Sequence, residues 1–67
     1  MAATAAELSS LATALDEITR RISDHAETAD ADKDEEVASE LFAIERSLTS
    51  ANRRLARLTV AIGRRTG

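Results

Sequence analysis

The stretch VASELFAIERSLTSANRRLARL, residues 37–58, decides the fold. Its apolar residues recur at alternating spacings of four and three, and the pattern continues beyond the quoted stretch to Ile62. The full set is Val37, Leu41, Ile44, Leu48, Ala51, Leu55, Leu58 and Ile62. This repeat places one apolar stripe along one side of an α-helix and is typical of helices that pack along a narrow seam. We therefore expect a helix over about 33–62.

The first half of the chain repeats the same pattern. Its seam residues are Leu8, Leu11, Leu15, Ile18, Ile22, His25 and Ala29. The chain has no proline, and its only glycines are Gly63 and Gly67, so nothing before position 63 breaks a helix. With a single aromatic residue and few β-branched residues, a sheet is disfavoured. We expect a first helix over about 5–29.

The ends of both helices carry capping signals. Thr4 with Glu7 fits a capping box for the first helix, and Asp32 with Glu35 fits one for the second. Gly63 follows the last seam residue, where a glycine commonly ends a helix. The pattern predicts an acidic turn at about 30–32 and a helix end at 62.

A short connection makes neighbouring helices antiparallel. The sequence therefore predicts an all-α, coiled-coil-like antiparallel two-helix hairpin that forms one domain over residues 1–67. The two seams match layer by layer when the turn is centred on Lys33, for example Leu8 with Leu58 and Ile18 with Leu48.

One seam between two helices gives a chain of 67 residues a small core, which such chains usually supplement with disulfides, a metal or oligomerisation. The chain has no cysteine, and one histidine does not make a metal site. We therefore expect self-association, with two hairpins forming a homodimeric four-helix bundle, or packing on another helical protein.

A smooth face of small residues is the expected contact surface. Position a of the heptad is held by Leu8, Leu15, Ile22 and Ala29 on the first helix and by Leu41, Leu48, Leu55 and Ile62 on the second. The other seam residues occupy d, and e follows d. The expected self-association face lies on e and b positions and comprises Ala5, Ala12, Thr19, Ala26, Ala38, Phe42, Thr49 and Ala56. An alternative interpretation is that alanine simply favours helix and Phe42 is a lone exposed apolar residue.

Charge is segregated along the chain. Residues 1–40 hold eleven acidic and three basic residues, whereas residues 41–67 hold one acidic and six basic residues. The turn end of the hairpin is therefore acidic and the open end is basic. Two antiparallel hairpins would place each acidic end beside a basic end, which favours one orientation of the dimer.

Four arginines line the outer face of the second helix, namely Arg46, Arg53, Arg57 and Arg64. They are either a solvated face or a surface for an anionic partner, such as a nucleic acid, a nucleotide or an acidic protein. The net charge of −3 and the lack of stacking aromatic residues beside these arginines disfavour a nucleic acid.

No catalytic constellation is present. His25 is expected to lie in the seam, where protonation would introduce a charge, and no nucleophile and orienting group surround it. The acidic run DADKDEE, residues 30–36, lacks the glycine and the distal glutamate of a calcium-binding loop. We expect a protein that is not an enzyme and binds no metal or cofactor.

The chain has neither an apolar run of membrane-spanning length nor a basic, apolar leader at its start. We therefore expect a cytoplasmic protein without membrane contact.

Residues 37–58, with the pattern V-A-S-x-L, E-R-x-L and R-R-L, resemble small two-helix proteins of high-GC actinobacteria. The resemblance covers about a third of the chain and implies a helical hairpin. Anti-sigma hairpins that bind cyclic di-GMP carry a helix motif E-x3-S-x2-R-x3-Q-x3-D. Here only Ser50 and Arg53 match it, since Arg46, Arg57 and Ala61 stand at its other positions.

Overall fold

The first helix begins at the predicted cap. In the computed structural model, which describes residues 4–66, helix α1 spans Ala5–Ala31 and is preceded by Thr4 in an extended conformation. The Thr4 side-chain oxygen accepts a hydrogen bond from the backbone N–H of Glu7 at 3.1 Å. This bond satisfies one of the backbone donors left unpaired in the first turn of a helix, and it confirms the predicted N-cap.

The turn between the helices is built around Lys33, which adopts a left-handed conformation with φ of 62°. The N–H of Lys33 donates to the Asp30 carbonyl at 3.0 Å, and that of Asp34 donates to the Ala29 carbonyl at 2.9 Å. These two bonds form a Schellman motif, which ends an α-helix by satisfying its last carbonyls. A non-glycine residue in this conformation costs about 1–2 kcal/mol, so Lys33 stores strain at the turn.

Helix α2 spans Glu35–Thr66, and both of its ends differ from the prediction. Asp34, not Asp32, caps its start, because the Asp34 carboxylate accepts the Val37 N–H at 3.3 Å. Asp32 instead forms the C-cap of α1. Gly63 does not end the helix, since it lacks the left-handed conformation of a terminating glycine and the helix continues through it.

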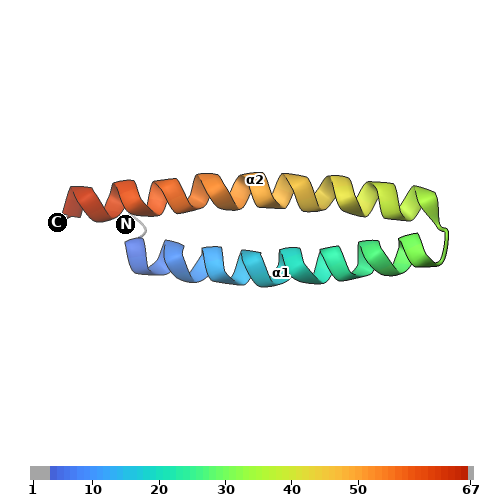
Figure 1. Ribbon diagram of the computed structural model, residues 1–67. Coiled ribbons are helices and arrows are strands. Elements are labelled where there is room, and N and C mark those ends of the chain that lie inside the picture. Colours follow the sequence, from blue (N-terminus) through green and yellow to red (C-terminus); the bar gives the residue numbers. More distant parts are fainter. Residues whose placement is uncertain (1–3, 67) are drawn as a thin grey trace.

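The two helices run antiparallel and pack against each other, joined at one end by the short turn (Figure 1). The predicted all-α two-helix hairpin is thereby confirmed, and residues 4–66 contain no strand. The molecule measures 50 × 17 × 14 Å. A thickness of 14 Å is little more than the diameter of one helix with its side chains, so the hairpin is a single layer.

The seam between α1 and α2 is rotated from the predicted one. The predicted d residues Leu11, Ile18, Val37, Ile44 and Leu58 are 38–58% exposed, so that half of the seam prediction is wrong. The residues that are buried or half-buried between the helices occupy positions a and e instead. On α1 they are Ala5, Leu8, Ala12, Leu15, Thr19, Ile22, Ala26 and Ala29, and on α2 they are Ala38, Leu41, Glu45, Leu48, Asn52, Leu55, Thr59 and Ile62.

Alanine at four of the eight e positions favours this rotation. Ala26 and Ala38 are the most deeply buried residues of the core, at 0% and 3% exposure. Alanine allows two helix backbones to approach closely, and large residues at position a then fill the remaining space. Large d residues would hold the helices further apart, so they lie on the flank.

Candidate interaction surface

Seven d positions form an exposed apolar surface along the hairpin, which we call the open stripe. Its five large members, at 38–58% exposure, account for all but one of the large hydrophobic residues that are exposed among residues 4–66; the exception is Val60. Monomeric proteins rarely leave large apolar side chains exposed in a contiguous row. The open stripe comprises Leu11, Ile18 and His25 on α1, and Val37, Ile44, Ala51 and Leu58 on α2.

Both halves of the open stripe lie on the same broad side of the hairpin. In an antiparallel pair, equivalent heptad positions of the two helices flank the seam on the same side. With a and e in contact, the d residues border one side of the seam and the b residues border the other. The b residues Asp16, Thr49 and Ala56 do line one common hollow, which confirms this arrangement for their side.

The residues of the predicted self-association face lie on the seam and on the side of the hairpin away from the open stripe. The e residues Ala5, Ala12 and Thr19 are half-buried against the opposite helix, and Ala26 and Ala38 are fully buried there. A single hairpin therefore already covers much of that face.

The other members of that face are on α2. Phe42 and Thr49 are half-buried, and Ala56 is exposed. Sequence reasoning recognised the small residues at position e as a packing surface. It missed that they pack inside the hairpin, and that this frees the d residues.

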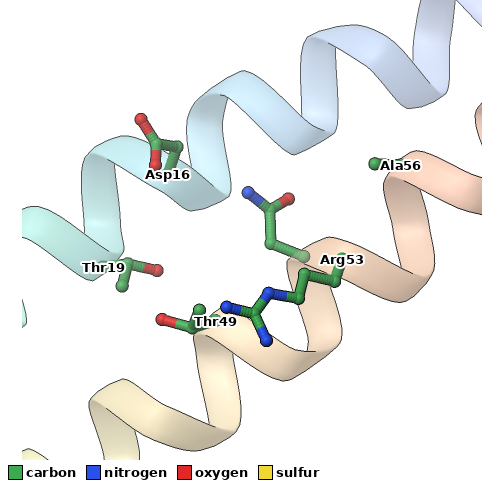
Figure 2. Close-up of a pocket in the computed structure, with 6 residues that line it drawn as sticks. Asp16, Thr19, Thr49, Arg53 and Ala56 are labelled. Atoms are coloured by element: carbon green, nitrogen blue, oxygen red, sulfur yellow. The ribbon is translucent and has the colours of Figure 1, made fainter.

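A hollow of about 200 Å³, lined mostly by polar residue types, lies on the side away from the open stripe. The hollow is lined by Asp16 and Thr19 of α1 and by Thr49, Arg53 and Ala56 of α2, and the Asp16 carboxylate points away from α2 (Figure 2). Asp16 is engaged with Arg20, whose guanidinium donates to its carboxylate at 2.8 Å and thereby has its pKa raised above the usual value. Ligand pockets usually measure about 300–1,000 Å³, so this hollow is too small for one.

Polar side chains inside the seam differ in whether they form hydrogen bonds. The hydroxyls of Thr19 and Thr59 donate to the carbonyls of Leu15 and Leu55, at 2.7 and 2.8 Å. The side-chain oxygen of Asn52 is buried without a hydrogen-bond partner. An unsatisfied buried acceptor costs about 1–3 kcal/mol, so Asn52 weakens the middle of the hairpin.

The predicted arginine face is exposed. Arg46, Arg53, Arg57 and Arg64 all lie in solvent on the outer side of α2. Within residues 4–66 the only ion pair joins Arg20 to Asp16, so none of the four arginines pairs with a carboxylate of those residues. Val60, at 54% exposure, lies between Arg57 and Arg64 in a shallow groove.

The hairpin is electrically polar along its 50 Å length. The turn end, residues 24–41, holds eight acidic residues and one lysine. The open end, residues 5–15 and 53–66, holds five arginines and one glutamate. Opposite charges therefore lie at the two ends of the molecule, which is a strong orienting feature for any second hairpin.

The described part of the chain contains neither a metal-holding cluster nor a membrane-spanning helix. Residues 4–66 contain no cluster of three His, Cys, Asp or Glu side chains that could hold a metal ion. Neither helix, over the same residues, combines the length and the apolarity that a membrane crossing requires.

The fold and this surface define a two-helix hairpin with one apolar side. No protein family, curated protein or solved structure matches this chain.

Proposed function

We propose that this protein is a non-enzymatic helical interaction module that self-associates through the open stripe. Two hairpins pack face to face over the d residues and form a four-helix bundle. The observation that carries the proposal is the row of large aliphatic side chains left 38–58% exposed on one side of a single layer. Stable domains bury such a face against a second layer.

Covering the open stripe contributes a free energy comparable with the cost of association. Fully burying a large aliphatic side chain contributes about 1.5–3 kcal/mol. The five large residues of the open stripe are about half exposed, so covering them contributes about 1 kcal/mol each, or about 10 kcal/mol for a dimer. This is of the same order as the ~4–15 kcal/mol that association costs in lost freedom of motion.

The experiment compares two exposed apolar residues in the full chain. Ile18 lies in the open stripe and Val60 on the outer face of α2, at 49% and 54% exposure. We expect light scattering on a sizing column to give about twice the chain mass of 7.2 kDa for the wild type and for Val60→Glu. Ile18→Glu should give the monomer mass, because a carboxylate buried in the bundle carries a large desolvation cost.

Circular dichroism on the same samples separates dissociation from unfolding. Both side chains are about half exposed in the isolated hairpin, so the two substitutions should perturb a single hairpin to a similar extent. A folded wild-type monomer, or equal masses for the two variants, would contradict the proposal. If Phe42→Glu dissociates the dimer and Ile18→Glu does not, association uses the alanine-rich face instead.

A further inference from the structure

We infer that the occupant of the open stripe is a second copy of this chain in one orientation, with the turn of each hairpin beside the open end of the other. This inference rests on the proposed self-association and assigns its geometry. The two-fold axis runs across the hairpin near Ile18, so that α1 lies on α1 and α2 lies on α2 of the second copy.

The exposed area of the chain exceeds that of a compact monomer by enough to form a stable interface. The hairpin exposes 5256 Å². A compact monomer of 7.2 kDa exposes about 4,100 Å², so the excess is about 1,100 Å². Each partner in a standard stable interface covers about 800 Å². The excess is somewhat larger than one partner's share of a standard stable interface, so the hairpin has enough surplus surface for a dimer.

The residues of the open stripe are spaced symmetrically about one point along the length of the hairpin. On α1, Leu11 and His25 are equidistant from Ile18. On α2, Ile44 and Ala51 are equidistant from the midpoint between residues 47 and 48. The outer pair of the stripe, Val37 and Leu58, is centred on the same midpoint.

These two centres lie level with each other. Lys33 is the middle residue between the end of α1 at Ala31 and the start of α2 at Glu35. Residues equally far from Lys33 therefore lie level, and the α2 midpoint lies level with residues 18 and 19. A single two-fold axis can thus pass through the centres of both halves of the open stripe, as an isologous dimer requires.

The charges choose between the two ways in which identical hairpins can stack face to face. A two-fold axis along the hairpin would bring the two acidic turn ends together. The axis across the hairpin instead sets each acidic end against a basic end. It also brings Glu40 opposite Arg54 of the second copy, both at exposed g positions that flank the stripe, where opposite charges commonly pair between helices.

Site-specific cross-linking tests the orientation, because the chain has no native cysteine. Ser47 is exposed, flanks the open stripe and lies next to the axis, so Ser47→Cys should become a covalent dimer with a short bifunctional maleimide. Asp32→Cys, at the turn, should remain monomeric under the same conditions. Ser39→Cys, exposed on the outer face of α2, measures cross-linking by random collision.

The outcomes separate this inference from the proposed function. Cross-linking of Ser47→Cys above the Ser39→Cys background, with none for Asp32→Cys, supports the orientation. Cross-linking of Asp32→Cys, or a dimer by light scattering in which Ser47→Cys stays at background, overturns the orientation and leaves self-association standing. A monomer by light scattering overturns both.

Charge reversal provides a second measurement that does not depend on cysteine placement. Glu40→Arg and Arg54→Glu should each weaken the dimer, because each creates two like-charge contacts across the interface. The double variant should recover the affinity of the wild type. Single and double variants with additive effects would mean that these two residues do not meet, and would overturn the orientation.

Discussion

At the scale of single residues, the turn depends on two residues with different roles. Lys33 adopts the left-handed backbone conformation that reverses the chain, and Asp34 lies between the helices and forms hydrogen bonds to both. The Asp34 backbone N–H closes α1 by donating to Ala29, and its carboxylate opens α2 by accepting from Val37. The short connection is therefore defined by hydrogen bonds and is not a flexible link.

The double role of Asp34 predicts unequal effects for two neighbouring acids. Asp34→Ala removes the N-cap of α2 and should lower the free energy of unfolding by about 0.5–2 kcal/mol. Asp32→Ala is the matched control, since Asp32 is exposed and its side chain forms no hydrogen bond to the start of α2. It should change stability by less than about 0.5 kcal/mol.

Urea unfolding followed by circular dichroism, at one protein concentration, measures both variants. Equal losses of stability, or a larger loss for Asp32→Ala, would mean that Asp32 caps α2, as the sequence pattern predicts.

At the scale of the helices, the C-terminal part of α2 differs most from expectation. Gly63 lies inside the helix, and a Cβ built on it would meet no atom within 4 Å. Arg64 and Arg65 follow in the last turn, where positive charge interacts favourably with the helix dipole. Gly63 was expected to end the helix, but the helix-favouring residues on both sides of it allow the helix to continue.

Gly63→Ala should therefore stabilise the protein. Alanine is better than glycine in a helix by up to about 1 kcal/mol, and nothing obstructs the added methyl group. We expect a higher thermal midpoint and slightly more helical signal. A lower midpoint would show that Gly63 ends the helix in a left-handed conformation, because alanine is strained there.

At the scale of the whole molecule, the hairpin is a thin layer with one apolar side and two oppositely charged ends. In the proposed bundle the arginine face, including Arg46 and Arg53, points away from the second copy and stays open to an anionic partner. The charge of the ends then selects orientation, whereas the open stripe supplies most of the affinity.

Coupling of folding to association predicts a thermal midpoint that depends on protein concentration. Each tenfold increase in concentration favours the dimer by about 1.4 kcal/mol, which should raise the midpoint by several degrees. Ile18→Glu should show a midpoint that is lower and independent of concentration. A wild-type midpoint that does not change with concentration would mean that the single hairpin accounts for all of the stability.

The sequence by itself determined the two helices, the antiparallel turn around Lys33 and the cap at Thr4. These features depend on local periodicity and on hydrogen bonds between residues three to five apart, which the residue types dictate. The residue that caps α2 was not predicted correctly, because it depends on the hydrogen bonds that Asp34 forms in the folded turn.

Only the tertiary structure decided which side of each helix faces the other. The residues at positions a, d and e all recur every seven residues, so periodicity is equally compatible with an a–d seam and an a–e seam. The choice depends on how closely two backbones approach, and the buried Ala26 and Ala38 let them approach at position e. That choice leaves Ile18 and the rest of the open stripe exposed, and so determines the surface through which we propose this protein acts.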